Sequence, residues 1–332
     1  MTGPAVTAKR AHPGLRVIAV AAAILVARPG PGWSDAAFEE WVRELEQEAR
    51  QRRISATTLR AVLPTLQILP RTLELQRRQP EVRLSWAEYL RRVVPAARVV
   101  QARRNLDRHA APLAAAGERY GVQPRFIVAL WGIESDFGRN TGDTPVLNSL
   151  ATLAYAGSRR DYFRRELLEA LAVVDAGDVR ADRMLGSWAG ALGQCQFMPS
   201  NYRRLAVDGD GDGRRDIWGT PADVFASIAR FLSAHGWRDD QTWGRQVRLP
   251  PGFDRRLAGP DVRMRLSRWQ ALGVRRADGR DLPRRDLWSS MVLPDGAGGS
   301  AYVVYDDFEV LLKWNRSTHF ALAVGHLADR LR

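Results

Sequence analysis

The 332-residue sequence predicts a mainly α-helical fold with a small strand-containing insertion near its C-terminal end. Apolar residues recur at three- and four-residue spacing through most of the chain, which is the pattern of helices that bury one face. After Trp237 this spacing gives way to short segments separated by Gly- and Pro-rich turns, as is typical of strands. Hydrophobic residues make up 45% of the chain, so a substantial core can form.

The first 32 residues have the pattern of a secretory signal peptide. Three basic residues precede the apolar run Val17 to Ala27, and small or turn residues follow it. The run is short for a bilayer span, and a retained anchor is the alternative. Cys195 is the only cysteine, so there is neither an N-terminal thiol for a lipid nor an intrachain disulfide. We expect 1–32 to be removed and the mature protein to be periplasmic and soluble, without stable membrane insertion or lipidation.

Residues 33–120 are predicted to form an N-terminal helical region. Ser34 is a candidate helix cap. The apolar face of the helix that follows it consists of Phe38, Trp41, Val42 and Leu45. Further helical sequence extends from Trp86 through Tyr120, with Gly121 as its expected end.

A predicted helix between Pro124 and Gly138 places a carboxylate on its apolar side. Pro suits a first helical position and Gly a helix end. Glu134 continues the apolar stripe that includes Ile127 and Trp131. Removing a carboxyl from water raises its pKa, so Glu134 can hold a proton near neutral pH and donate it to a leaving group. A buried glutamate paired with an arginine is the structural alternative.

Two further helices are well delimited. One is expected from Tyr162 to Ala176, before Gly177, with Phe163, Leu167, Leu171 and Val174 on its inner face. The other is expected from Pro221 to His235. Its signals are Thr220 as cap, Asp223 at the third position and Gly236 at the end.

Residues 241–305 are predicted to form the small insertion. Gln246 to Leu249 and Tyr302 to Tyr305 are its candidate strands. The remaining 306–332 are expected to return to the core as a C-terminal helix, from Ser317 to Leu331. Its inward face is predicted to carry Phe320, Val324 and Leu327.

Three motifs follow the Glu134 helix in a fixed order. They read Ser187-Trp-Ala-Gly-Ala-Leu-Gly-Gln-Cys-Gln-Phe-Met-Pro-Ser200, Asp208-Gly-Asp-Gly-Asp-Gly-Arg-Arg-Asp-Ile-Trp218 and Lys313-Trp-Asn-Arg-Ser317. With the Glu134 helix, they resemble the lytic murein transglycosylase B family, which cleaves peptidoglycan on a lysozyme-like scaffold. The resemblance extends from about Phe38 to the C-terminus. It implies a lysozyme-like α+β catalytic core at 121–240, including an Asp-rich loop at 208–219 and surrounded by helices.

The resemblance implies a reaction with one carboxylate and no required cofactor. Glu134 would first act as acid toward the MurNAc–GlcNAc bond and then as base on the C6 hydroxyl, closing a 1,6-anhydro ring. Ordinary glycosidases use two carboxylates, for which Asp136 and Asp143 are the local candidates. A hydrolytic muramidase using Glu134 and a catalytically lapsed wall-binding protein are the alternatives.

The resemblance also assigns substrate-binding residues. Ser187 would bond and orient Glu134, and Gln196 would line the subsites. Asn315 would lie near the reacting sugar, and Phe197 and Met198 would form an apolar floor under the sugars. Trp314 stands where the family usually has tyrosine, so we expect the phenol's hydrogen bond to be lost and ring stacking to persist.

Each assignment has a structural alternative. Packing in the core is the alternative for Phe197, Met198 and Trp314, and a turn or cap role is the alternative for Ser187 and Gln196. Cys195 has no recognisable base and is predicted to be a small buried hydrophobe.

The Asp-rich loop resembles the start of an EF-hand. Asp208, Asp210 and Asp212 occupy positions 1, 3 and 5, and Arg214 can offer its carbonyl at position 7. Position 12 is Gly219 rather than glutamate, and the family substitutes a later aspartate, here Asp223. A structural Ca²⁺ is therefore one interpretation. The alternative is an acidic turn with Asp223 in a capping box.

The net charge of +13 favours a polyanionic partner. No nucleic-acid-binding motif is recognisable, and the arginines are spread along the whole chain. We expect peptidoglycan glycan strands as the partner and no nucleic acid, with cell-wall synthesis proteins as further candidates.

Overall fold

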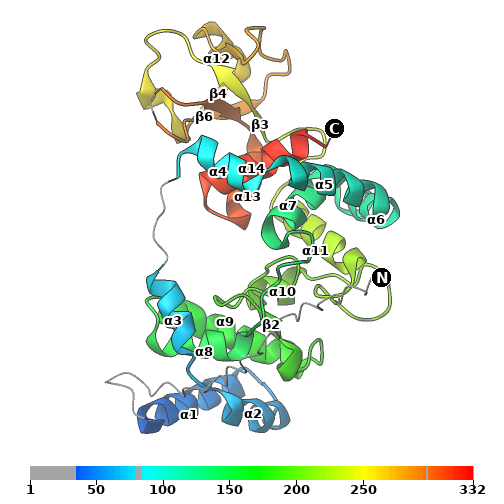
Figure 1. Cartoon of the computed structure of the whole chain (residues 1–332), viewed down its shortest axis with the longest axis vertical. Helices are drawn as coiled ribbons and strands as arrows, with labels where there is room; N and C mark the ends of the chain where they lie inside the picture. Colours follow the sequence, from blue (N-terminus) through cyan, green and yellow to red (C-terminus); the bar gives the residue numbers. More distant parts are fainter. Residues whose placement is uncertain (1–34, 79–83, 297, 332) are drawn as a thin grey trace, which may run out of the picture.

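The computed structural model describes residues 35–78, 84–296 and 298–331. The expected signal peptide and the expected cap at Ser34 lie outside these ranges. Within them, no helix is both long and apolar enough to cross a membrane. The elements form an elongated molecule with helices at one end and in the middle and a sheet at the other end (Figure 1).

The end of the molecule opposite the five-stranded sheet is mainly helical. Its elements are α1 (Asp35–Gln51), α2 (Ala56–Val62), η1 (Leu63–Thr65), α3 (Pro70–Arg77), α8 (Val146–Ala156) and α9 (Arg160–Asp175). The Asp175 carboxylate accepts hydrogen bonds from the Ser55 backbone N–H and from the Thr58 hydroxyl. These bonds hold the start of α2 against the end of α9. The predicted 162–176 helix is thus confirmed, displaced by one or two residues.

The middle of the molecule consists of α4 (Trp86–Val93), α5 (Ala96–Arg108), α6 (Ala110–Tyr120), α7 (Pro124–Ser135), α10 (Pro199–Leu205) and α11 (Pro221–Ala234). The helical sequence predicted from Trp86 to Tyr120 is confirmed and forms three consecutive helices. Proline disfavours helical backbone at the residue before it, and Pro95 accordingly separates α4 from α5. His109, with φ −112°, separates α5 from α6. Gly121 ends α6 in the left-handed conformation, as predicted.

The Glu134 helix, α7, ends earlier than its glycine suggests. Ser135 is its last residue, because Asp136 and Phe137 both adopt left-handed backbone, with φ of 52° and 60°. Such backbone is uncommon outside glycine. The chain therefore turns away immediately after Glu134, which places the carboxyl at the end of a rigid element.

Two sheets are present in the described residues. A two-stranded ladder pairs β1 (Thr144–Pro145) with β2 (Leu185–Gly186). A five-stranded antiparallel sheet has the order β4-β6-β7-β3-β5. Its strands are β3 (Gly244–Arg248), β4 (Gly259–Arg265), β5 (Arg275–Arg276), β6 (Trp288–Val292) and β7 (Ala301–Val304).

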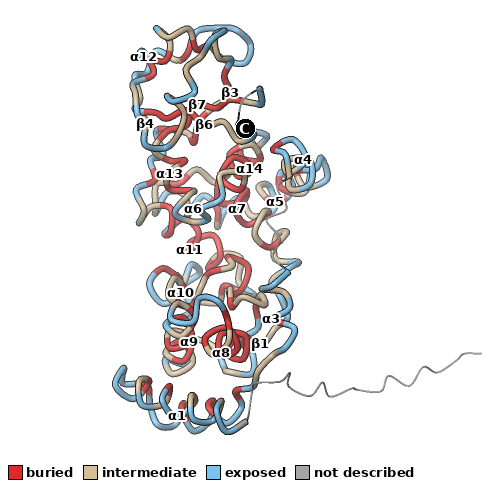
Figure 2. Tube along the Cα trace, turned by 90° about the vertical axis from the view of Figure 1, so that its left-hand side faces the viewer, coloured by how far each residue is buried: buried red, intermediate tan, exposed pale blue. Residues whose placement is uncertain are grey.

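The central strand β7 of the five-stranded sheet is buried on both faces. Tyr302 and Val304 of β7 join the main helical core, whereas Ala301 and Val303 point to the opposite side. That side is covered by α12 (Leu266–Ala271), whose Trp269 is fully buried. Short helices η2 (Ala181–Arg183) and η3 (Arg255–Leu257) complete the connections. The buried residues run from the helical body into the sheet (Figure 2).

The C-terminal segment contains two helices rather than the one expected. These are α13 (Asp306–Trp314) and α14 (Thr318–Asp329). Ser317 caps α14 by accepting from the Phe320 N–H. The predicted inward face of this helix, Phe320, Val324 and Leu327, is buried as expected. The mainly α-helical fold class with a small strand-containing insertion is confirmed.

The close approach of α14 to the start of the sheet requires glycine at 325. A Cβ there would lie 2.3 Å from Cδ2 of the buried Trp243. Trp243 also donates its indole N–H to Asp329. On helix propensity alone, Gly325→Ala would stabilise α14 by about 1 kcal/mol. We predict the opposite sign, a loss of about 1–3 kcal/mol in the free energy of unfolding, from overpacking against Trp243.

Chemical denaturation of the wild type and Gly325→Ala measures this difference. A matched control is Gly325→Ala in a Trp243→Leu background, where the obstructing ring is gone. Equal or greater stability of the single variant would contradict the packing argument.

Candidate active site

Glu134 lies on the last turn of α7 among apolar and aromatic side chains. The residue as a whole is partly exposed to solvent, but its carboxyl group is surrounded by protein atoms on most sides. Loss of hydration raises the pKa of Glu134 to about 7, although a hydrogen bond from Trp314 acts in the opposite direction. The predicted placement of this carboxyl on the buried side of the helix is confirmed. No salt bridge joins Glu134 to an arginine within the described ranges.

Trp314 holds the Glu134 carboxyl directly. Its indole Nε1–H donates to Glu134 Oε1 at 2.6 Å. The ring also packs against Phe197 and Phe231, with centroid distances of 5.3 and 4.6 Å. The expectation concerned only the phenol's hydrogen bond and did not foresee that the indole N–H supplies a donor to Glu134. An indole N–H is a donor that reaches the carboxylate as a phenol would.

Asp136, two residues beyond Glu134, is tied to two arginines. Arg139 binds one carboxylate oxygen at 3.0 Å and Arg98 the other at 3.5 Å. Burial works to raise the pKa of Asp136, but the hydrogen bonds and charges of Arg139 and Arg98 outweigh it and lower the pKa. Asp136 is therefore held ionised close to a carboxyl that is poised to be protonated. Asp143 is exposed in the loop before β1.

The short β1–β2 ladder brings the Ser187 motif to the segment that follows α7. Thr144 pairs with Gly186, and a Cβ on Gly142 would lie 2.1 Å from the Gly186 carbonyl oxygen. Ser187 Oγ accepts from the Ala191 N–H at 3.0 Å, which closes a tight turn. No hydrogen bond joins Ser187 to Glu134 among the residues that the structure describes. This geometry matches the turn alternative, and orientation of Glu134 by Ser187 stays a prediction.

The remaining predicted substrate residues lie along the same loop and on α13. Gln196 has φ 50° and donates its side-chain amide to the Thr141 and Gly193 carbonyls. Phe197 is buried beneath Trp314, whereas Met198 is half-buried. Asn315 follows Trp314 and is exposed, with its Oδ1 accepting from the Ser317 N–H. The fold thus gathers Trp314 and Phe197 around Glu134.

Two residues near the Glu134 helix were not predicted from the sequence. Gln194 is buried, accepts from Trp131 Nε1 at 2.7 Å, and donates to the Trp218 carbonyl at 2.7 Å. It joins the back of α7 to the Asp-rich segment. Tyr89 of α4 is close enough for the Glu134 charge to raise its pKa, in addition to the larger effect of burial. The position of Gln194 two residues before Gln196 in the same motif could have drawn attention to it, but no sequence pattern pointed to Tyr89.

Cys195 behaves as predicted. It is fully buried, its thiol lies 3.6 Å from the Val224 carbonyl, and burial raises its pKa well above the usual value. A thiol in this environment is not an activated nucleophile.

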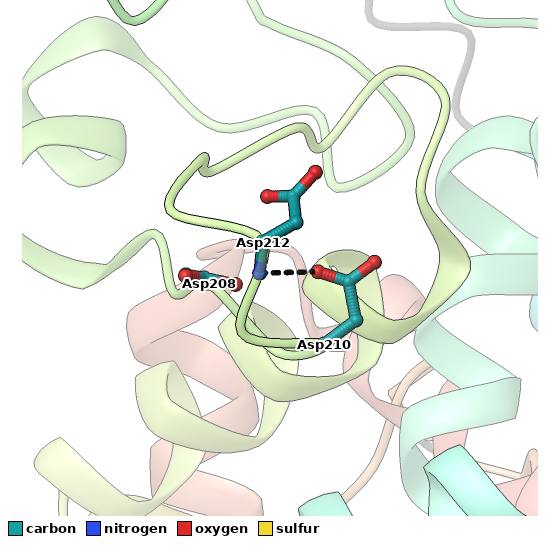
Figure 3. Close-up of side chains that lie close together, drawn as sticks. All are labelled: Asp208, Asp210 and Asp212. Carbon is teal, nitrogen blue, oxygen red and sulfur yellow. Dashed lines mark hydrogen bonds between the residues drawn. The ribbon is translucent and has the colours of Figure 1, made fainter.

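The Asp-rich loop gathers three carboxylates at the surface (Figure 3). One oxygen each from Asp208, Asp210 and Asp212 lies within 4.8 Å of the others, a spacing that fits a shared cation. Backbone N–H groups of Gly211 and Gly213 bond Asp208 and lower its pKa.

Asp223 supports the loop from inside. It is buried, and its two oxygens accept from the Gly209 and Asp216 N–H groups. The capping-box alternative is wrong, because no side-chain bond caps α11. As placed, Asp223 orders the loop backbone and lies outside the three-carboxylate group.

The chain is similar to known proteins in both sequence and structure. A family model described as transglycosylase SLT domain matches residues 37–329. The membrane-bound lytic murein transglycosylase B of Escherichia coli (strain K12) is 36% identical over 218 residues, which are 63% of this chain. The match covers 57% of that relative's length.

Solved structures are similar over most of the chain. SltB3 from Pseudomonas aeruginosa, in complex with NAG-anhNAM-pentapeptide, has a TM-score of 0.85 and 43% identity, covering 89% of this chain and 79% of that one. Escherichia coli Slt35 in complex with calcium has a TM-score of 0.75 and 27% identity, covering 89% and 92%.

The fold is therefore that of the lysozyme-like lytic transglycosylases, as the sequence resemblance implied. The chain belongs to the transglycosylase SLT domain family.

The hydrogen bond from Trp314 to Glu134 leads to a testable prediction about the pKa of Glu134. A donor to a carboxylate stabilises its ionised form, so Trp314→Phe removes an interaction that lowers the pKa. We predict that the pKa of Glu134 rises above its value of about 7 in this variant. Titration of the Glu134 side-chain carbon by NMR, assigned with Glu134→Gln, measures the change.

Trp218→Phe is the matched control, since its indole donates to the Leu185 carbonyl instead. An unchanged or lower Glu134 pKa in Trp314→Phe would show that the bond does not hold the carboxylate.

Proposed function

We propose that this chain is a peptidoglycan lytic transglycosylase that cleaves the MurNAc-β-1,4-GlcNAc bond without water. The observation that carries the proposal is the Glu134 carboxyl, whose pKa near 7 suits both donation and acceptance of a proton. The complexes of the similar SltB3 with NAG-anhNAM-pentapeptide and NAG-NAM-pentapeptide support a glycan strand as substrate.

The reaction uses Glu134 twice. Protonated Glu134 donates to the glycosidic oxygen as the C1–O bond breaks, leaving an oxocarbenium-like muramoyl sugar. The resulting carboxylate then removes the proton from the C6 hydroxyl, whose oxygen bonds to C1. Glu134 is protonated again at the end, so no proton, water or cofactor is consumed.

Trp314 keeps Glu134 Oε1 occupied by a donor, which leaves Oε2 as the oxygen that carries the exchanged proton. Asp136 is unsuited to a second catalytic role because Arg98 and Arg139 already bind its oxygens. The two arginines more than balance its negative charge, so Asp136 instead orders the backbone and guanidinium groups just after Glu134.

Substrate contacts follow the same surface. Gln196 and Asn315 hold sugar substituents, and Met198 with Trp314 supplies the apolar floor, supported from beneath by buried Phe197. Ser187 acts on Glu134 after a change in its hydroxyl rotamer. Residues 121–240 with the C-terminal helices form the catalytic unit, and residues 241–305 form a separate module.

The protein works in the periplasm after export, where its net charge of +13 favours the carboxylate-bearing wall. The three-carboxylate group of the Asp-rich loop holds a structural Ca²⁺ with the Arg214 carbonyl, and Asp223 fixes the loop backbone around it. The calcium complex of the similar Slt35 supports this assignment. The ion stabilises the fold and takes no part in the reaction.

The first test replaces the catalytic carboxyl. Glu134→Gln keeps size and hydrogen bonding but cannot exchange the proton, so release of fragments from purified sacculi should fall at least about a hundredfold. Asp136→Asn should lose less than about tenfold, since Asp136 does not exchange the proton. Chromatography of soluble muropeptides gives both rates.

A Glu134→Gln variant that still cleaves would remove Glu134 from the mechanism. An equal loss in Asp136→Asn would favour a two-carboxylate hydrolase. Thermal unfolding of both variants checks that the fold is retained.

The calcium assignment predicts a ligand-dependent stability. Calcium at a hundred times its dissociation constant should stabilise the folded state by about 2.7 kcal/mol, seen as a higher Tm. Asp208→Asn should abolish the response, whereas Asp278→Asn, in a distant surface turn, should retain it. A wild-type Tm unaffected by calcium and by chelator would exclude the site.

A further inference from the structure

Trp288 is an exposed aromatic residue that the catalytic site does not use. It begins β6 and is 46% exposed, whereas most large apolar side chains in the described ranges are buried. The guanidinium of Arg265 lies over its ring, 4.5 Å from the centroid. Arg265 faces Trp288 across the β4–β6 ladder, and Arg263 two residues earlier lies on the same face. These three residues are called the Trp288 patch.

Arg263 and Arg265 lie on β4, an edge strand of the sheet, and Trp288 begins the adjacent inner strand β6. Charged residues on an edge strand commonly prevent pairing with other chains. That explanation accounts for Arg263 and Arg265, but an exposed tryptophan works against it. The contact with Arg265 covers part of the ring and leaves almost half of the residue open. A flat apolar face beside guanidinium groups suits a ligand with both a sugar face and carboxylates.

The surrounding module is strongly basic. Residues 241–305 contain twelve arginines and six aspartates, with no lysine or glutamate. Several aspartates are bound to neighbouring arginines, such as Asp278 to Arg280 and Asp254 to Arg256. Arg265 donates to the Asp286 backbone carbonyl, and its charge adds to the hydrogen bonds from Ser267 that lower the pKa of the Asp286 carboxyl. The charge surplus is thus available to an anionic polymer.

Helix α13 links the patch to the catalytic carboxyl. Arg263 binds Asp306 at the start of α13, and Trp314 at its end bonds Glu134. Nine helical residues span about 13 Å, so the patch and Glu134 lie at opposite ends of one short helix. The sheet edge lies beside α13 in both views of the molecule (Figures 1 and 2).

We infer that the Trp288 patch is an accessory binding surface for a peptidoglycan strand, outside the site where the bond is cleaved. Trp288 stacks on a sugar face, and Arg265 binds a carboxylate of the lactyl group or peptide stem. The inference rests on the proposed function for the identity of the polymer. Its role is to retain a long, insoluble substrate, so it affects affinity for the wall and leaves the chemical step unchanged.

The test measures binding of the full chain to purified sacculi by sedimentation, with Glu134→Gln present to prevent cleavage. Trp288→Ala and Arg265→Ala should each weaken binding about fivefold or more, as expected for an aromatic or arginine anchor. Val100→Ala and Arg71→Ala are matched controls, because they remove another exposed apolar side chain and another exposed positive charge. Both should bind as the parent does.

With Glu134 restored, Trp288→Ala should cleave a soluble four-sugar substrate with kcat/KM within twofold of wild type and release fragments from sacculi more slowly. Sacculus binding within twofold of the parent would overturn the inference. So would a loss of binding to double-stranded DNA alone, which would indicate a nucleic-acid surface. The two proposals can fail separately. If the wild type cleaves no sacculi but Trp288→Ala still weakens binding to them, the proposed function is contradicted and the accessory surface is supported.

Discussion

The hydrogen bond from Trp314 to Glu134 joins two segments that are 180 residues apart in the chain. Glu134 ends α7, and Trp314 ends α13, which leaves the sheet module at Asp306. The bond therefore requires that the helical middle, the sheet module and the C-terminal helices all be in place. Trp314 also sets the environment of the carboxyl, because the ring that donates this hydrogen bond excludes water from one side of it.

The site balances two opposing influences on one carboxyl. Burial raises the pKa of Glu134 to about 7, and the Trp314 donor keeps it from rising further. A carboxyl left without any donor would remain protonated and serve poorly as a base. Asp136 stays ionised a short distance away because two arginines hold it. Neighbouring carboxylates in different environments thus take different charges at one pH.

The local spacing of apolar residues predicted many of the helices, but it could not predict contacts between segments that are distant in the sequence. The spacing of Ile127, Trp131 and Glu134 determines which side of one helix faces inward, so the buried carboxyl was predictable. Pro95 also marks the break between α4 and α5, since proline disfavours helical backbone at the residue before it.

Other features depended on the tertiary fold. The hydrogen bond from Trp314 to Glu134 joins residues that are far apart in the sequence, so local spacing does not predict it. The same holds for Asp223, whose buried oxygens are used by Gly209 and Asp216 rather than by its own helix. The strand order in the sheet likewise depends on contacts between distant segments. Alternation of polar and apolar residues along each strand does not determine it.

The most direct measurement concerns the oxygen that attacks C1. Sacculi digested by the wild-type protein in H₂¹⁸O would be analysed by mass spectrometry of the released fragments. A single carboxyl acting on the sugar's own C6 hydroxyl predicts 1,6-anhydro-muramic acid ends without ¹⁸O. Fragments heavier by one water and carrying ¹⁸O at the reducing end would contradict the intramolecular mechanism and make the protein a hydrolase.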